Sequence, residues 1–168
     1  MESNRRKLVI GERYLSFEVD SEHYCIDILK VKELLGMTAI TPLPRTAEYI
    51  KGVINLRGQI IPIIDLRLKF GLEEIAYTKH TGIIIVEVNF AGEPMLMGII
   101  VDTIQEVISI PEDKISQIPY INARIRAEYI RGIANTDDGM KIILDVLKIL
   151  NSDELSTVKE IVPKDKEK

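Results

Sequence analysis

The chain has 168 residues, a formal net charge of −4 and a single cysteine, Cys25. The acidic balance disfavours a protein that binds nucleic acid through clustered Lys and Arg, and one cysteine excludes an intrachain disulfide. The sequence shows neither a secretory leader nor an uncharged apolar run of about 18 residues, so we expect a cytoplasmic protein.

Apolar residues recur mostly at every second position or in short runs, which is typical of β-strands. In chain order these runs are YLSFEVD, HYCIDI, GIIIVEVNF and PMLMGIIVD. The polar links at residues 19–24 and 89–95 join them into two hairpins. Short helices are expected only at 29–36, 46–52 and 126–132 and directly after Asp65 and Asp145. The sequence therefore predicts a mainly β protein with a few short helices.

An internal repeat organises the chain. Residues 49–70, YIKGVINLRGQIIPIIDLRLKF, align without a gap on residues 129–150, YIRGIANTDDGMKIILDVLKIL. Each copy follows one hairpin, an apolar segment with a Glu and a segment with a Pro. We therefore expect two β modules, residues 12–80 and 81–150, and a C-terminal helix or charged tail at 151–168.

A module of this size has only a marginal core, so the two are expected to bury faces against each other and to form a groove between them. The sequence leaves open whether the modules exchange edge strands.

Arg57 stands in the predicted turn of the first copy, between Leu56 and Gly58. The second copy has Asp137 at the corresponding position, so the turn itself does not require a cation. Two interpretations are open: Arg57 contacts a partner, or it is a solvated arginine on the surface.

No catalytic or metal-binding motif is recognisable in the sequence. His23 and His80 have no Cys, His or carboxylate at ligand spacing, and the Asp137-Asp138-Gly139 turn lacks the pattern of a calcium loop. Cys25 fits a small buried side chain in an alternating strand better than a catalytic thiol. We expect no catalysis, no cofactor and no metal.

The string GVINLRGQIIPIIDLR at 52–67, preceded by IDILKVKEL and followed by GIIVDTIQEVISI, closely resembles the CheW family of bacterial chemotaxis coupling proteins. The likeness runs from about Tyr14 to Asn151. The resemblance implies two SH3-like five-stranded β-barrels packed around a shared hydrophobic region, and no catalysis.

The resemblance further implies a scaffold that links the cytoplasmic hairpin tip of a chemoreceptor, a methyl-accepting chemotaxis protein, to the regulatory domain of the histidine kinase CheA. Such a protein is recruited to membrane-associated receptor arrays. The positions that match the family's receptor-facing residues are Val31, Glu33, Arg57 and Val107.

The positions that match the kinase-facing residues are Ile28, Pro119 and Tyr120. At Tyr120 and Ile121 this chain departs from the acidic-aromatic pair that the resemblance leads one to expect there. Three alternatives stay open at this stage: a CheW-like module that acts with a receiver domain, a small enzyme with a pocket between the barrels, and a generic SH3-like peptide-binding module.

Overall fold

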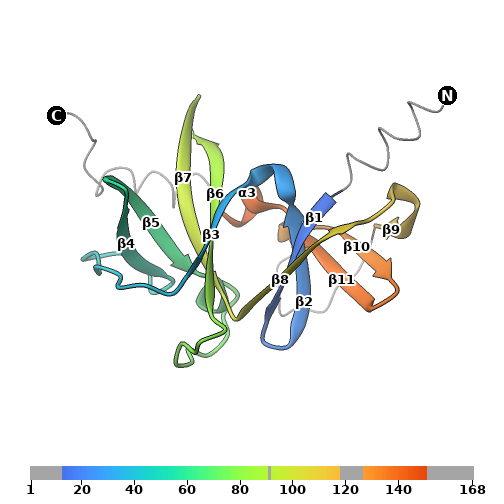
Figure 1. Ribbon diagram of the computed structural model, residues 1–168, viewed down its shortest axis with the longest axis horizontal. Coiled ribbons are helices and arrows are strands. Elements are labelled where there is room, and N and C mark those ends of the chain that lie inside the picture. The colour runs from blue at the N-terminus through green and yellow to red at the C-terminus, as the bar shows by residue number, and fades with distance from the viewer. Residues whose placement is uncertain (1–12, 91, 118–126, 151–168) are drawn as a thin grey trace.

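The structure is a computed structural model that describes residues 13–90, 92–117 and 127–150 (Figure 1). Its strands form two sheets, each curled into a small barrel, and the barrels lie side by side. The six-stranded sheet has the order β8 (Thr103–Ser109), β1 (Arg13–Val19), β2 (Glu22–Asp27), β11 (Gly139–Leu144), β10 (Ile130–Thr136) and β9 (Ile115–Ser116). The five-stranded sheet has the order β3 (Val31–Gly36), β6 (Gly82–Phe90), β7 (Glu93–Val101), β5 (Gln59–Asp65) and β4 (Ile50–Leu56).

The prediction of a mainly β protein built from two small barrels is confirmed, although one sheet has six strands where five were expected, because the two-residue β9 adds to its edge. The helices are short: η1 (Ile28–Lys30), α2 (Leu66–Lys69), η2 (Glu112–Lys114), η3 (Ala127–Tyr129) and α3 (Val146–Ile149). None of the described helices is long and apolar enough to span a membrane.

The helices expected after Asp65 and Asp145 are confirmed as α2 and α3. Each aspartate carboxylate accepts hydrogen bonds from the first backbone N–H groups of its helix, as an N-cap does. Each aspartate backbone N–H donates in turn to the carbonyl of the tyrosine that opens its repeat copy, Tyr49 or Tyr129, at 2.8 and 2.9 Å. The two copies of the repeated sequence therefore form the same local structure, a hairpin followed by a capped helical turn.

The helix expected at 29–36 is wrong, since only its start lies in η1 and the rest forms β3. Val31 to Gly36 pair with β6, and this pairing outweighs the local preference of Lys, Glu and Leu for helix. The expected helix at 46–52 is a turn that leads into β4, and only η3 is helical within the described part of 126–132.

The two predicted hairpins, β1–β2 and β6–β7, are confirmed, but each belongs to the barrel of the other repeat. The β1–β2 hairpin pairs with β8 and, in parallel, with β11, whereas β6–β7 pairs with β3 and, in parallel, with β5. The repeats exchange their hairpins, so each sheet contains strands from both 12–80 and 81–150, and these ranges are not the boundaries of the two sheets. The expected element at 151–168 lies outside the described residues.

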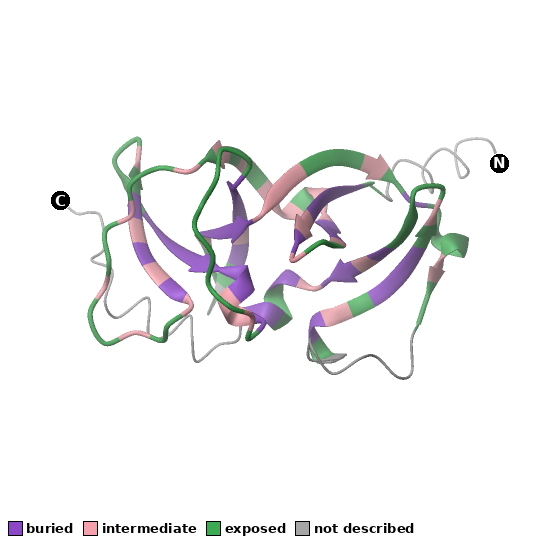
Figure 2. Ribbon diagram, turned by 90° about the horizontal axis from the view of Figure 1, so that it is seen from below, coloured by how far each residue is buried: buried purple, intermediate pink, exposed green. Residues whose placement is uncertain are grey.

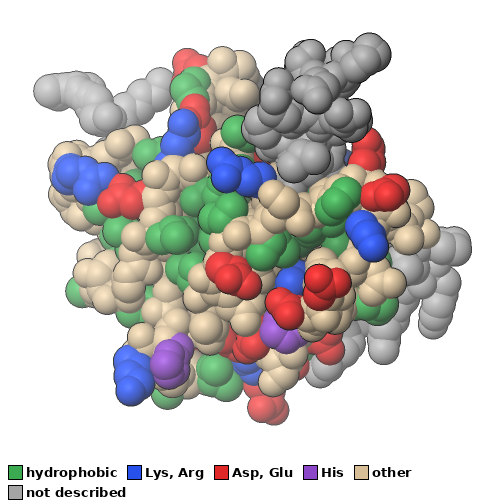
Figure 3. All heavy atoms as spheres, turned by 45° about the vertical axis from the view of Figure 1, so that its right-hand side comes forward, with side chains coloured by type: hydrophobic (Ala, Val, Ile, Leu, Met, Phe, Trp, Pro, Cys, Tyr) green, Lys and Arg blue, Asp and Glu red, His purple; other side chains and the backbone are tan. Residues whose placement is uncertain are grey.

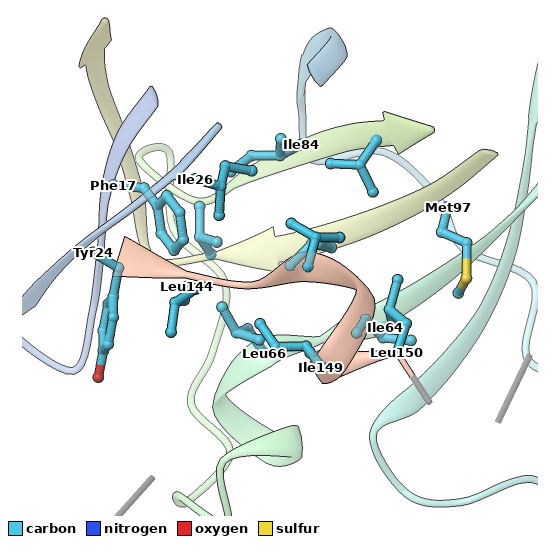
Figure 4. Packing of buried hydrophobic residues seen from close by; sticks show 14 of the residues in the cluster. Phe17, Tyr24, Ile26, Ile64, Leu66, Ile84, Met97, Leu144, Ile149 and Leu150 are labelled. Carbon is cyan, nitrogen blue, oxygen red and sulfur yellow. The ribbon is translucent and has the colours of Figure 1, made fainter. Parts of the chain in front are cut away.

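Buried apolar side chains form one large cluster between the barrels and a smaller one inside each barrel. Figure 2 shows where buried residues lie along the strands of both barrels. The large cluster, here called the shared core, draws on both sheets and on α2 and α3. Figure 4 shows Phe17 and Tyr24 from the first hairpin beside Leu144, with Ile64 and Leu66 next to Ile149 and Leu150. Because both sheets contribute to this cluster, each barrel buries part of its apolar surface against the other barrel.

Candidate functional site

β3 and β8 are the outer strands of their sheets, and both cross the middle of the molecule on the side that faces the viewer in Figure 1. Each pairs on one side only, with the first strand of the hairpin from the other repeat. An outer strand leaves one row of backbone groups and the side chains of both its faces accessible from the open edge. Three of the four expected receptor-facing residues lie on these two edge strands, Val31 and Glu33 on β3 and Val107 on β8.

Val31 and Val107 lie on the corresponding edge strands of the two repeats, but at different positions of those strands. Val31 on β3 lies opposite Val86, and Val107 on β8 lies opposite Leu15. Both partners belong to the shared core, and residues directly opposite each other point to the same face of a sheet. Val31 packs partly against the shared core, while Val107 is 47% exposed.

A β-bulge separates Val31 from Glu33. Glu33 lies opposite Ile85 although Val31 lies opposite Val86, so Lys32 is the extra residue, and Glu33 points to the opposite face of β3 from Val31. On that face Ile85 belongs to the cluster inside the five-stranded barrel. The bulge thus places Val31 on one face of β3 and Glu33 on the other.

Glu33 meets Arg57, which lies in the turn between β4 and β5. The Arg57 guanidinium donates two hydrogen bonds to the Glu33 carboxylate, one from Nη1 to Oε2 at 3.3 Å and one from Nη2 to Oε1. These bonds lower the pKa of Glu33 and raise that of Arg57, so both groups are charged at neutral pH. The Arg57 side chain is nevertheless 70% exposed, and two of its five N–H donors are engaged by Glu33.

Arg57 also has a backbone φ of +53°, followed by Gly58 at +86°. This pair of positive angles is that of a tight hairpin turn, in which Asn or Gly is usual at the first position because a larger side chain is disfavoured there. Asn55 supports the turn by accepting a hydrogen bond from the Gly58 backbone N–H. An arginine held in a disfavoured backbone conformation and largely exposed supports the contact interpretation over that of an incidental surface residue.

The four expected receptor-facing residues therefore do not form one flat patch. Val31 and Val107 lie on the faces directed to the shared core, whereas Glu33 and Arg57 lie on the other face of β3. A partner placed along the open edge of β3 reaches both faces.

Two exposed leucines in this region carry no signal in the sequence. Leu34 lies opposite Ile84 of the shared core, on the same face as Val31, and is 45% exposed. Leu29 in η1 is largely exposed beside the half-buried Ile28. With residues 29–36 expected as a helix, the bulge that sets these faces could not be foreseen. In Figure 3 hydrophobic side chains gather across the middle of the visible face, with acidic and basic side chains around them.

Of the expected kinase-facing residues, Ile28 packs partly against the shared core, three residues before Val31. Pro119 and Tyr120 lie outside the described residues.

A buried arginine fixes the start of β8 relative to the other barrel. Arg67 in α2 is 11% exposed, and its Nη1 donates to the Asp102 carboxylate at 2.7 Å, immediately before β8 begins. Its Nη2 lies 3.4 Å from the carboxylate of Asp20 in the β1–β2 turn, and its Nε donates to the Glu73 carbonyl at 3.0 Å. This set of contacts, here called the Arg67 bridge, connects α2 to the β1–β2 turn and to the residue that links β7 to β8.

Among the described residues no group of three or more His, Cys, Asp or Glu side chains could hold a metal ion. Cys25 is fully buried, and burial raises the pKa of its thiol to about 12, with the charge of Lys141 acting in the opposite sense. The thiol is therefore protonated at neutral pH, which makes it a poor nucleophile.

The comparisons with known proteins agree with this architecture. The family model of the CheW-like domain matches residues 13–154. The chemotaxis protein CheW of Klebsiella aerogenes is 37% identical over 152 residues, which cover 90% of this chain and 89% of that protein. The chemotaxis protein CheW of Treponema pallidum is 34% identical over 145 residues, or 84% of this chain and 83% of that protein.

A solved structure is similar as well. The crystal structure of the scaffolding protein TtCheW from Thermoanaerobacter tengcongensis superposes with a TM-score of 0.75 at 38% sequence identity, over 86% of this chain and 95% of that one. Sequence and fold thus agree over nearly the whole described chain, and the protein belongs to the CheW-like family of chemotaxis scaffold proteins.

Proposed function

We propose that this protein is a non-catalytic scaffold that couples the cytoplasmic tips of chemoreceptors to the histidine kinase CheA. In this role it acts in the cytoplasm and is recruited to membrane-associated receptor arrays. Membership of a family of chemotaxis scaffolds supports the proposal at the level of the process.

The observation that carries the receptor half of the proposal is the pair of open edges with exposed aliphatic side chains. A helical receptor tip laid along β3 would place its apolar side chains on Val31 and Leu34, and Val107 would extend this surface from the other barrel. Binding of an amphipathic helix through a few aliphatic anchors with charges at the rim is a common mode of recognition.

Arg57 supplies the rim charge in this proposal. Glu33 holds the guanidinium by two of its donors and so limits its orientations, while the remaining N–H groups are free to reach a carboxylate or carbonyl on the receptor. Glu33 is thus a positioning residue, and Arg57 makes the contact. A lysine at position 57 would keep the charge but would lose the planar fork that serves both partners.

The kinase would bind through a separate surface around η1, with Ile28, Pro119 and Tyr120 as the residues proposed from the family resemblance. Leu29 joins this set because a large aliphatic side chain that is exposed next to Ile28 is suited to contact. Since Ile28 precedes Val31 by three residues, the proposed kinase and receptor surfaces adjoin at η1.

The test titrates a receptor-tip fragment into wild type, Arg57→Ala and Arg57→Lys by calorimetry and measures CheA activity in reconstituted receptor–kinase complexes with the same variants. Arg57→Ala is expected to weaken receptor binding about 5- to 100-fold, the usual loss for a charge-assisted hydrogen bond, with Arg57→Lys in between. Receptor-coupled kinase activity is expected to follow the same order.

Asp137→Ala is the matched control, because Asp137 occupies the corresponding turn of the second repeat. It is expected to leave receptor binding unchanged. If Arg57→Ala binds the fragment as wild type does, Arg57 is only a solvated turn residue. If wild type itself neither binds the fragment nor changes CheA activity, the coupling role is wrong.

A further inference from the structure

The two barrels are related by an approximate twofold axis. The strand order β3-β6-β7-β5-β4 corresponds strand for strand to β8-β1-β2-β11-β10. Because each hairpin lies in the barrel of the other repeat, the rotation that places the first repeat on the second also places the second on the first, which is the property of a twofold axis. This axis exchanges the edge strands β3 and β8, which both cross the middle of the molecule (Figure 1).

The apolar residues of the two edge strands follow this axis. Leu34 on β3 and Val107 on β8 each lie opposite the third residue of the strand with which they pair, and their exposed fractions are nearly equal, 45% and 47%. Val31 corresponds in the same way to Ile104, and both pack partly against the shared core. An apolar surface with this symmetry does not by itself distinguish the two directions in which a helical hairpin can lie across it.

The charged residues beside this apolar surface do not follow the axis. In both edge strands a glutamate lies at the β-bulge, Glu33 in the first repeat and Glu106 in the second. Glu33 is paired with Arg57, whereas the corresponding turn of the second repeat has Asp137 in place of the arginine. Among the described residues, no cation pairs with the exposed carboxylate of Glu106. The surface therefore has a cation at one rim and a carboxylate at the other.

We infer that this charge difference fixes the direction in which the receptor tip lies on the surface, with Arg57 facing an acceptor of the receptor and Glu106 facing a Lys or Arg. The inference rests on the proposed coupling function and adds Glu106 to it as a specificity-determining residue. A receptor tip in the reverse direction would bring its basic group to Arg57 and its acidic group to Glu106. Such a juxtaposition of like charges is costly at an interface and suppresses the wrong arrangement.

The first test is a double-mutant cycle on the receptor-tip fragment. Each Lys and Arg of the fragment is replaced by Ala in turn, and each variant is titrated by calorimetry into wild type and into Glu106→Gln. One basic position is expected to weaken binding to wild type about 3- to 10-fold and binding to Glu106→Gln by less than about twofold. Because Glu106 is exposed, Glu106→Gln is expected to fold as wild type does.

The second test reads the direction of the bound fragment from nitroxide labels and the backbone amide signals of the protein. A label at the tip turn of the fragment is expected to broaden signals of one barrel, and a label at its open end those of the other barrel. In Glu106→Lys both rims carry a cation, so each label is expected to broaden signals of both barrels. Glu112→Lys, which makes the same change of charge at an exposed position of η2, is the matched control and is expected to keep the single direction.

The inference is wrong if no basic position of the fragment couples with Glu106, or if Glu106→Lys binds the fragment in the single direction of wild type. In both cases the coupling function stands, because the fragment still binds. If wild type does not bind the fragment at all, the coupling function is wrong and the inference falls with it.

Discussion

The Arg67 bridge is expected to stabilise the whole molecule, and Arg67→Leu is the variant that measures it. The second repeat has Leu147 at the corresponding position, so leucine is compatible with this helical turn. The substitution keeps much of the side-chain volume but leaves the Asp102 and Asp20 carboxylates without their common cation.

The size of the effect follows from the burial of the three groups. Removing one partner of a fully buried ion pair costs about 3–5 kcal/mol, because the remaining charge is left uncompensated. The side chains of Asp102 and Asp20 are 23% and 33% exposed, so water partly compensates them and we expect a loss of about 2–4 kcal/mol. For a chain of this length that corresponds to a fall in melting temperature of roughly 5–15 °C.

Urea denaturation followed by circular dichroism measures the loss, with Lys51→Ala as the control. Lys51 and Glu74 form an ion pair at 2.6 Å in which Glu74 is 51% exposed, and such surface pairs contribute less than about 1 kcal/mol. Wild type and both variants are expected to unfold in one transition, because the barrels share a core. The reasoning is refuted if Arg67→Leu loses no more stability than Lys51→Ala.

Val107→Asp is expected to weaken receptor binding while lowering the melting temperature by less than about 5 °C, whereas Val31→Asp is expected to lower both, because Val31 packs against the shared core; equal thermal losses in the two variants would contradict this. Ile28→Glu is expected to reduce binding to the CheA regulatory domain more than binding to a receptor fragment, and equal losses would show that the two proposed surfaces are one. Burial raises the pKa of Asp65 above its ordinary value, with the hydrogen bond from Tyr77 acting in the opposite sense. The folded protein then holds this proton more tightly than the unfolded chain, so stability falls as the pH rises from the unfolded to the folded pKa. Asp65→Asn removes this fall, and its urea midpoint relative to wild type is expected to improve as the pH rises above the ordinary aspartate pKa of about 4.

Local features of the fold could be predicted from the sequence because short-range rules determine them. Both hairpins follow from period-two alternation around polar links, and α2 and α3 follow from Asp65 and Asp145 as N-caps. The repeat follows from the gapless alignment of residues 49–70 with residues 129–150. None of these features depends on which strands meet across the molecule.

The exchange of hairpins could not be predicted in this way. The alternating pattern of each hairpin is compatible with pairing to the strands of its own repeat and equally with pairing to those of the other repeat. Only the tertiary pairing decides that β6–β7 joins β3 and β5. The same limit applies to the site. The resemblance identified Glu33 and Arg57 separately, but not the hydrogen bonds between them. The bulge at Lys32 places Glu33 and Val31 on opposite faces of β3, and no residue type near Lys32 predicts that bulge.

Because β1–β2 and β6–β7 are exchanged, each sheet contains strands from both halves of the polypeptide. Neither half expressed alone contains a closed barrel, yet the two halves mixed as separate chains contain every strand of both. A cut in the link between α2 and β6 therefore leaves two fragments that complement each other only by folding together. The two barrels are also joined by short links, η1 between β2 and β3 and the single residue Asp102 between β7 and β8, and they bury the shared core between them, so they cannot separate without exposing that core.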